Sequence, residues 1–406
     1  MSEKCKAITA RDVQGLKYFR HLLPLFERLH EVGCERDKAS NRQLHMDQYC
    51  SLVLLFLFNP CLRSLRSLQQ ASELKNVQRK LGCSRASLGS LSEATDVFDA
   101  ERLQEIIGEL GEPTKPIRDV AGEEVSHLLT AVDRSVVQTL STIAEAAYLK
   151  NRNGESRSAW RLHTHFDIDR GVPTRIDVTP GKNSGKSDEK NVLRNNLQAD
   201  HCYVMDRWYA QFTLFSPINA IDSSYVCRVR DNSSYEVTES REVSHAAAGQ
   251  GVLSDEVIKL GLSKKRAERP DHPVRLVCVK VMPHEKRGGR KGGSSGPPSD
   301  GVLRIATNLV DPPAELIAEI YKQRWTIELF FRFFKHILGC RHLLSQDKVG
   351  IEIQTYCAII ACLLISLVTG RKPTLRTYEM ICLYLQGWAD EEEFLNHLQK
   401  LKPHDQ

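Results

Sequence analysis

The hydrophobic period of the chain changes at one proline-containing segment, GEPTKPIRD, from Gly111 to Asp119. Before it, segments such as LKYFRHLLPLFERLHEV carry apolar residues three and four positions apart, the spacing of an amphipathic helix. After it, HLLTAVDRSVVQTL alternates or runs apolar, as a buried β-strand does. The change predicts a helical region over residues 1–118 and a region built around a sheet over residues 119–350.

The second region predicts strands interspersed with a few helices. WRLHTHFDID and VPTRIDVTP flank a turn at Asp169-Arg170-Gly171 and predict a hairpin. A helix from Ser187 to Leu197, the strand HCYVMD and a strand from Val302 to Val310 follow. This succession predicts an α/β fold with a mixed sheet at its core.

A long interruption, residues 209–301, separates the last two of these strands. It contains the strand-like segments SYVCRVRD and VRLVCVKVM and the flexible segment HEKRGGRKGGSSGPPSDG. Basic residues crowd it: Lys264, Lys265, Arg266, Arg269, Arg275, Lys280, Lys286, Arg287, Arg290 and Lys291. A solvated basic loop is the ordinary explanation of such a run, but this density favours contact with a polyanion.

The N-terminal region contains two short predicted helices. One covers Ser64–Leu74, and Ser84 or Ser87 can cap another that starts near Leu88. With Gly82 between them, these helices are compatible with a helix-turn-helix. An ordinary helical bundle explains the pattern equally well, so both interpretations stay open.

The composition is that of an ordinary globular protein, with 41% hydrophobic and 26% charged residues and a net charge of +5 over 406 residues. The 12 cysteines include no CxxC pair, and scattered single cysteines fit a reducing compartment. The start, MSEKCKAITARD, has no apolar h-region. The longest apolar run, Tyr356 to Val368, falls short of the ~20 residues of a membrane span and predicts a buried helix. We therefore expect a cytoplasmic protein without membrane contact.

Two aspartates stand at the ends of hydrophobic strands. Asp133 ends LLTAVD, and Asp206 ends CYVMD. A single aspartate there is more often a turn former, but two on neighbouring strands can share one cation. Hard oxygen ligands with open positions are what Mg²⁺ prefers.

The segment IYKQRWTIELFFRFFKHIL, from Ile320 to Leu338, predicts a single helix that is mostly apolar. At about 100° per residue, five polar side chains share a stripe roughly a quarter of the circumference wide. They are Tyr321, Arg324, Glu328, Arg332 and Lys335. Ion pairs four residues apart on an amphipathic helix are the simplest explanation, but a stripe on so apolar a helix is expected to face a cleft.

The order and spacing of these residues resemble the insertion sequence 4 family of DDE transposases. AVDRS and VMDRWY resemble the first two aspartate motifs of that family, and IYKQRWTIELFFRFFKHIL closely resembles the third, with its Tyr-Arg-Glu-Lys signature. RIATNLVDPPAELIAEIY resembles the strand and lead-in before the third motif. The resemblance extends from about Thr130 to Leu343.

The resemblance implies a ribonuclease H-like core, interrupted by a largely β insertion between the second aspartate and the glutamate. Asp133, Asp206 and Glu328 would be catalytic and would hold two Mg²⁺ ions, with Mn²⁺ able to replace them. Arg324, Lys335 and Tyr321 would bind phosphates near the cut, and we add Arg332 because it shares their stripe. Of the basic insertion, we assign Lys264, Lys265, Arg266, Arg287, Arg290 and Lys291 to DNA binding.

The function implied is that of an insertion-sequence transposase. It would bind terminal inverted repeats of double-stranded DNA, cut them and join the ends to target DNA, as a homodimer in the synaptic complex. Residues 1–118 would be a helical DNA-binding domain, and residues 351–406 predict two or three helices that can pack on the core, mediate dimer contacts or contact DNA. The protein would lie on the nucleoid when bound to DNA.

Two departures from the family pattern keep other functions open. Arg134 follows the first aspartate where many relatives have a small residue, so it either crowds the metal site or points away. No tryptophan lies between Trp208 and Trp325, which leaves a hairpin cleavage step undecided; Tyr225 or Tyr235 could stack a flipped base instead. The alternatives are a catalytically inactive relative that acts as a DNA-binding repressor or inhibitor of transposition, and a nuclease that cuts without strand transfer.

Several rival polar residues have structural explanations. Asp167 is a further acid near the hairpin, and Asp169 is expected in its turn. Asp188 and Glu189 are expected in the first turn of a helix, where negative charge is favoured. His163 and His165 alternate on a strand without a third ligand at matching spacing, which favours a structural role.

Overall fold

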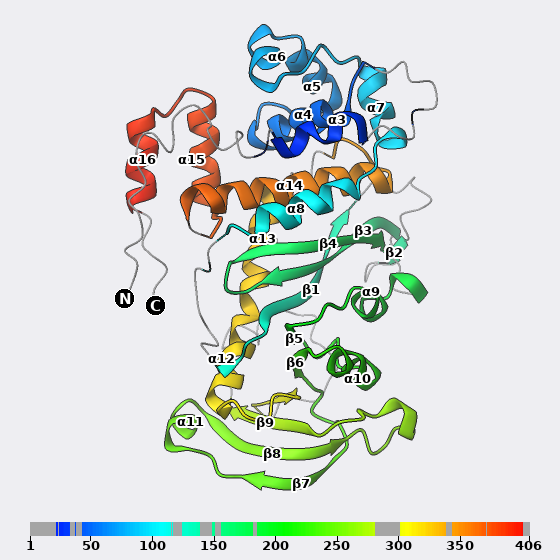
Figure 1. Cartoon of the computed structure of the whole chain (residues 1–406), viewed down its shortest axis with the longest axis vertical. Coiled ribbons are helices and arrows are strands. Elements are labelled where there is room, and N and C mark those ends of the chain that lie inside the picture. The colour runs from blue at the N-terminus through cyan, green and yellow to red at the C-terminus, as the bar shows by residue number, and fades with distance from the viewer. Residues whose placement is uncertain are drawn as a thin grey trace.

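A mixed β-sheet occupies the middle and lower part of the protein in Figure 1, and helices lie above its upper end and along its sides. This computed structural model describes residues 22, 24–32, 37, 43–114, 116, 124–138, 148–150, 156–181, 185–280, 301–337, 343–370 and 372–400.

The described strands are β1 (Leu128–Gln138), β2 (Tyr148–Lys150), β3 (Ser156–Asp167), β4 (Val172–Pro180), β5 (His201–Met205), β6 (Ser224–Arg228), β7 (Tyr235–Arg241), β8 (Val252–Leu260), β9 (Val274–Lys280) and β10 (Val302–Thr307). They pair in the order β2-β3-β1-β5-β6-β10-β9-β8-β7, with β4 also on β3. β4, β3 and β1 are antiparallel neighbours, whereas β1, β5 and β6 are parallel. The predicted α/β class with a mixed sheet at its core is confirmed.

The described helices of the N-terminal part are α3 (Leu29–Val32), α4 (Met46–Phe58), α5 (Leu65–Ser72), α6 (Lys75–Leu81), α7 (Leu88–Val97) and α8 (Arg102–Gly111). Those within and after the sheet are α9 (Glu189–Asn195), α10 (Phe212–Ala220), α11 (His245–Gly249), α12 (Ala314–Gln323), α13 (Trp325–Ile337), α14 (Lys348–Thr369), α15 (Leu375–Leu385) and α16 (Glu391–Lys400). Two short 3₁₀ turns lie at η3 (Gly185–Ser187) and η4 (Arg266–Glu268).

Apolar side chains that alternate along the central strands contribute to two separate hydrophobic cores, one on each face of the sheet. On β1, Leu129 and Ala131 join the larger core, which includes α4, α8, α13 and α14. Val132 joins the smaller core on the other face of the sheet, against α9 and α10. Because successive side chains of a strand point to opposite faces, this pattern fixes which side chains beyond Val132 face which helices.

The predicted interruption at residues 209–301 includes one strand of the central sheet. β6 pairs in parallel with β5, and α10 connects the two strands. The strands added beyond this core are β7, β8 and β9, which reach it through β10. The short apolar segment SYVCRVRD reveals a strand but not its partner, which is why its place could not be predicted.

The N-terminal helices and the sheet share one hydrophobic core. α14 packs against β4, α8 and α4, and its apolar stretch is mostly buried within the protein, as predicted. Ser87, one of the two serines considered as a cap, caps α7 with its side chain, and Ser64 caps α5 in the same way. α6, between them, ends at Gly82 in the left-handed conformation that suits glycine. The predicted domain limits at 118 and 350 remain a prediction.

A buried ion pair joins the β7–β9 layer to the segment that leads into α12. Arg275 on β9 donates two hydrogen bonds of 2.8 Å to the carboxylate of Asp255 on β8. Its remaining terminal nitrogen donates to the carbonyl oxygens of Leu309, Val310 and Pro312. The side chain of Arg275 is only 2% exposed, so its charge depends on this one carboxylate.

Replacing Asp255 by alanine should therefore destabilise the fold strongly. The substitution leaves the Arg275 guanidinium buried without a counter-charge, which costs about 3–5 kcal/mol of unfolding free energy. Denaturant unfolding measures this loss. Glu236→Ala is the control, since Glu236 pairs with Lys259 on the surface and such pairs contribute about 1 kcal/mol or less. Equal losses in the two variants would refute the structural role of the buried pair.

Candidate active site

The two predicted strand aspartates lie on the same face of the sheet and next to each other in its parallel register. Val132 on β1 pairs with Met205 on β5, so Asp133 and Asp206 are the next residues along both strands. Both continue the face that contributes to the larger core, on which α13 packs. The expectation that neighbouring strands bring these acids together therefore agrees with the structure.

Asp133 differs from the prediction in one respect. It does not end its strand, because β1 continues to Gln138 and pairs with β3 over that length. What ends near Asp133 is the pairing with β5, whose last residue is Met205. The pairing of β1 with β5 therefore stops just before Asp133, whereas its pairing with β3 continues and holds the backbone of Asp133 in place.

The third acid comes from a helix that is broken at one residue. The segment predicted as one helix from Ile320 to Leu338 forms α12 and α13 in succession, which run along the sheet (Figure 1). At Arg324 the backbone bonds shorten to the three-residue spacing, from Arg324 to Tyr321 and from Ile327 to Arg324. Residue 324 therefore lies at the junction of the two helices.

Arg324 pairs with two of the three acids at once. One terminal nitrogen lies 2.7 Å from Oε1 of Glu328, and the other lies 3.6 Å from Oδ2 of Asp133. The arginine side chain is 14% exposed, so both contacts are partly shielded from water. The expected i, i+4 ion pair between Arg324 and Glu328 is therefore present, and Arg324 pairs in addition with Asp133 on β1.

The pKa of Asp133 reflects its burial and the charges around it. Burial raises its pKa to about 6, and the negative charges of Asp206 and Glu328 act in the same direction. The backbone N–H of Arg134, which donates to Oδ1 over 2.7 Å, and the charge of Arg324 oppose this rise. A site where carboxylates repel each other is one that a cation stabilises.

The donor set fits a divalent cation, although the side chains do not converge on one point. Among the described residues, no three His, Cys, Asp or Glu side chains are grouped closely enough to hold a metal ion. Arg324, bonded to Asp133 and Glu328, neutralises part of the charge that an ion would neutralise. Carboxylate oxygens at the end of a strand pair remain the ligand type that Mg²⁺ prefers.

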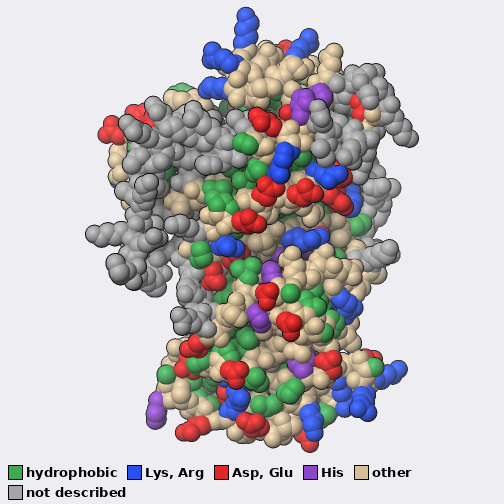
Figure 2. Space-filling view, viewed as in Figure 1, with side chains coloured by type: hydrophobic (Ala, Val, Ile, Leu, Met, Phe, Trp, Pro, Cys, Tyr) green, Lys and Arg blue, Asp and Glu red, His purple; other side chains and the backbone are tan. Residues whose placement is uncertain are grey.

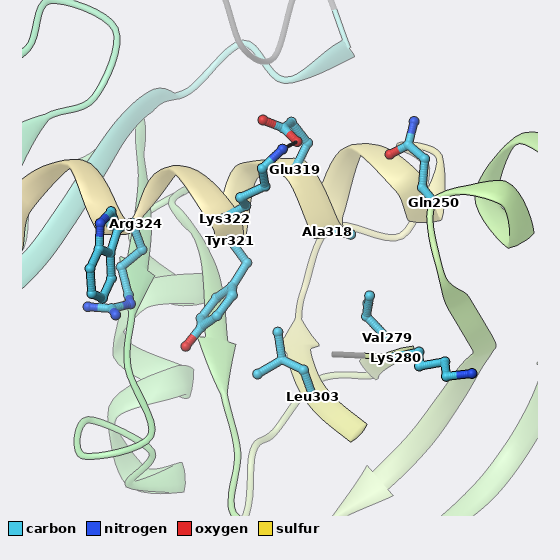
Figure 3. A pocket seen from close by; sticks show the side chains of 10 residues that line it. Gln250, Val279, Lys280, Leu303, Ala318, Glu319, Tyr321, Lys322 and Arg324 are labelled. Atoms are coloured by element: carbon cyan, nitrogen blue, oxygen red, sulfur yellow. Dashed lines mark hydrogen bonds and ion pairs between the residues drawn. The ribbon is translucent and has the colours of Figure 1, made fainter. Parts of the chain in front are cut away.

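A pocket of about 650 Å³ opens beside Arg324, at the junction of α12 and α13 (Figure 3). Figure 3 shows Tyr321 and Arg324 projecting from the same side of this junction. Burial raises the pKa of Tyr321 to about 12, so its hydroxyl stays protonated and can donate a hydrogen bond. The described lining also includes the cations Lys280 and Lys322 and the ring of Trp325.

The remaining predicted cations lie further out. Arg332 and Lys335 are exposed on α13. Lys264, Lys265 and Arg266 are exposed at the turn between β8 and β9. Figure 2 shows Lys and Arg side chains gathered at this end of the molecule and again over the N-terminal helices. Arg287, Arg290 and Lys291 lie outside the described residues.

The rival polar residues have the structural roles that were expected, with one addition. Asp188 caps α9, and Asp167 pairs with Arg170 at the hairpin. His163 and His165 are buried on β3, and His163 shares a hydrogen bond with Thr179. Glu189 lies in the first turn of α9, as predicted, and the addition is that its side chain is fully buried.

Glu189 also decides between the two orientations considered for Arg134. The arginine lies on the face of β1 opposite Asp133, and its Nε is 3.3 Å from Glu189. It therefore points away from the acids and does not crowd them. This pair could not be predicted from local patterns, because the two residues are distant along the chain.

Comparison with known proteins places the chain in a family. A model described as the transposase DDE domain matches residues 125–364. The chain belongs to the transposase DDE domain family. The matched residues include the two strands and the helix that carry the three acids, together with the β-rich layer between them in the sequence. The predicted resemblance to DDE transposases is therefore confirmed.

The curated relatives that the chain matches are named as transposases. The chain is 26% identical over 240 residues to the Sinorhizobium fredii protein named "Putative transposase y4zB", covering 57% of this chain and 61% of that one. It is 25% identical over 211 residues to a probable transposase for the insertion sequence element IS5377 of Geobacillus stearothermophilus, covering 52% and 49%. The chain thus spans about half to three fifths of the length of these relatives. Among solved structures, it is similar to piggyBac transposase in a synaptic complex with hairpin DNA, with a TM-score of 0.43 and 11% identity over 97% of this chain and 82% of that one.

The two buried histidines predict how stability depends on pH. Burial lowers the pKa of both His163 and His165 to about 4, whereas an unfolded histidine titrates near 6.5. Below pH ~6.5 the two histidines are protonated in the unfolded chain but not in the folded chain, so stability is lost as the pH falls towards 4.

The double variant His163→Gln/His165→Gln should lose less stability than the wild type between pH 7.5 and pH 5. The expected difference is about 2 kcal/mol per histidine, measured by denaturant unfolding at the two pH values. His245→Gln serves as control because His245 is exposed. A double variant as acid-sensitive as the control would show that the histidines are protonated in the fold.

Proposed function

We propose that the protein is the transposase of an insertion sequence of the insertion sequence 4 type. It binds the terminal inverted repeats of its element, cuts the DNA in a metal-dependent reaction and joins the ends to a target. Membership of the transposase DDE domain family supports this reaction class. The observation that carries the proposal is that Asp133 and Asp206 follow paired residues of two parallel strands, while Arg324 links Asp133 to Glu328.

The three acids would hold two Mg²⁺ ions, and Mn²⁺ could replace them. When bound, the ions would supply activation of water or of a DNA 3′-hydroxyl and stabilise the leaving oxygen at phosphorus. The acids remain ionised in that state, because a nearby cation favours the charged form of a carboxylate. For the Asp133 carboxylate, whose pKa is raised in the free protein, a bound cation would oppose that rise.

Arg324 is the residue best placed to bind the phosphate near the cut. Its guanidinium already lies beside two of the acids, so it can exchange a carboxylate for a phosphate, which it matches equally well in geometry. Tyr321 lies within cation–π distance of Arg324, 6.0 Å from guanidinium carbon to ring centroid, and its hydroxyl can donate to the same phosphate. Lys335 and Arg332, exposed on α13, would contact phosphates further along the strand.

The exposed cations at the β8–β9 turn, Lys264, Lys265 and Arg266, would bind DNA beyond the cleavage point. Arg287, Arg290 and Lys291 complete the proposed set. A homodimer in the synaptic complex would hold two DNA ends together. Arg134 was the main sequence argument for an inactive relative, and its contact with Glu189 supports the catalytic alternative.

The test is cleavage of a DNA fragment that carries the ends of the element, with Mg²⁺ present. Glu328→Gln removes one charged ligand and should lower the cleavage rate by at least about a hundredfold, while binding of the ends is kept. Glu379→Gln, an exposed acid on α15, is the control and should cut like the wild type.

Either of two results would count against the proposal. Cleavage by Glu328→Gln at the wild-type rate would remove this acid from the site. Tight binding of the ends without cleavage by the wild type would instead identify a DNA-binding repressor.

A further inference from the structure

Glu189 at the start of α9 is a fully buried acid with several partners on other elements. Its Oε2 lies 3.3 Å from Arg134 Nε and 3.4 Å from Arg161 Nη1, and its Oε1 lies 3.9 Å from Lys190 Nζ. The indole N–H of Trp208 donates to Oε1 as well. A buried carboxylate that binds so many donors restrains each side chain that contacts it.

Two of these partners also bind the strand aspartates, and they do so with their backbones. The backbone N–H of Arg134 donates to Asp133 Oδ1 over 2.7 Å. The backbone N–H of Trp208 donates to Asp206 Oδ1 over 2.8 Å. Glu189 is therefore connected to each aspartate through one residue, whose side chain it binds and whose backbone N–H binds the aspartate.

The connection lies where the strand pairing has stopped. The ladder between β1 and β5 ends at Val132 and Met205, one residue before the two aspartates. Trp208 lies in the turn that follows β5, outside that ladder. Because Oε1 of Glu189 binds the indole of this turn and Oε2 binds a side chain of β1, one carboxylate joins the two segments beyond their last paired residues.

We propose that Glu189 is a positioning residue that presets the carboxylates of Asp133 and Asp206 for a divalent cation in the DNA-free protein. The proposal rests on the function proposed above. Each backbone N–H occupies one oxygen of its aspartate and so fixes the plane of that carboxylate. Groups that hold metal ligands in this way contribute to metal binding, and their loss costs about 10–100-fold in metal affinity or activity.

A purely structural role for Glu189 leads to a different expectation. Glu189 is also a counter-charge for Arg161 on β3, whose side chain is only 7% exposed. If neutralising this buried charge were its whole role, loss of Glu189 would lower stability and leave metal affinity unchanged. If Glu189 positions the aspartates, metal affinity falls even where stability is restored.

The test measures Mn²⁺ binding to the DNA-free protein from the electron paramagnetic resonance signal of free Mn²⁺. The binding counted is the part that Asp206→Asn loses, which restricts the measurement to this site. Glu189→Gln should weaken this binding at least about tenfold. Asp177→Asn is the matched control, because Asp177 on β4 is a partly buried acid that accepts two hydrogen bonds from Arg175. It should bind Mn²⁺ like the wild type.

Two further variants cover the possibility that Glu189→Gln folds poorly. The double variant Glu189→Gln/Arg161→Gln removes the buried charge that the single variant leaves uncompensated, so denaturant unfolding should show more stability than in Glu189→Gln. Its Mn²⁺ binding should still be about tenfold weaker than that of the wild type. Trp208→Phe keeps a ring but lacks the indole N–H, and should weaken Mn²⁺ binding by less than Glu189→Gln does.

Three results would each overturn the proposal. They are wild-type Mn²⁺ affinity in the double variant or in Trp208→Phe, an equal loss in Asp177→Asn, and no Mn²⁺ binding by the DNA-free wild type. None of these measurements uses DNA or cleavage, so failure here is separate from failure of the cleavage test with Glu328→Gln.

Discussion

The parallel pairing of β1 with β5 is the constraint on which the rest of the site depends. It places Asp133 and Asp206 side by side on one face of the sheet, where their charges repel and where burial already disfavours ionisation. Nothing about two such carboxylates is stabilising by itself. They are held together by apolar packing, because Ala131 and Val204, two positions before them and on the same face of the sheet, belong to the larger core. The same core includes the apolar side of α13, the helix that carries Glu328.

Arg324 reduces the repulsion between the acids in the free protein. Its two ion pairs offset part of the repulsion, and its place at the junction of α12 and α13 lets its side chain reach both a strand acid and a helix acid. An arginine in this position has a second use, because the guanidinium that pairs with carboxylates also matches a phosphate. In the proposed reaction, metal cations would neutralise the acids in place of Arg324. A DNA phosphate would then bind the guanidinium of Arg324 in place of the carboxylates.

The α9 face of the sheet holds the complementary charge pattern. There one buried acid, Glu189, is surrounded by Arg134, Arg161 and Lys190, whereas on the α13 face one arginine serves several acids. Because Asp133 and Arg134 are neighbours on β1, each face stabilises the strand conformation that the other requires. Such coupling explains why a residue as large as arginine is accommodated beside the first acid.

Much of the site could be predicted because its signals are local. The spacing within the Ile320–Leu338 segment identified Tyr321, Arg324 and Glu328, and strand-end patterns identified both aspartates. Long-range pairing could not be predicted, because hydrophobic periodicity reports local secondary structure and not which segments meet in the fold. The contact of Arg134 with Glu189 and the place of β6 in the central sheet are two examples. The break at Arg324 was missed because no proline or glycine marks it.

The central claim is that Asp133, Asp206 and Glu328 hold the same metal ions. Mapping the metal position tests it most directly. With Fe²⁺ in place of Mg²⁺, ascorbate and peroxide generate hydroxyl radicals that cut the backbone beside the bound ion. The account predicts cuts near all three residues, suppressed by excess Mg²⁺ and absent in Asp133→Asn. Cuts at other positions, or the same cuts in Asp133→Asn, would contradict it.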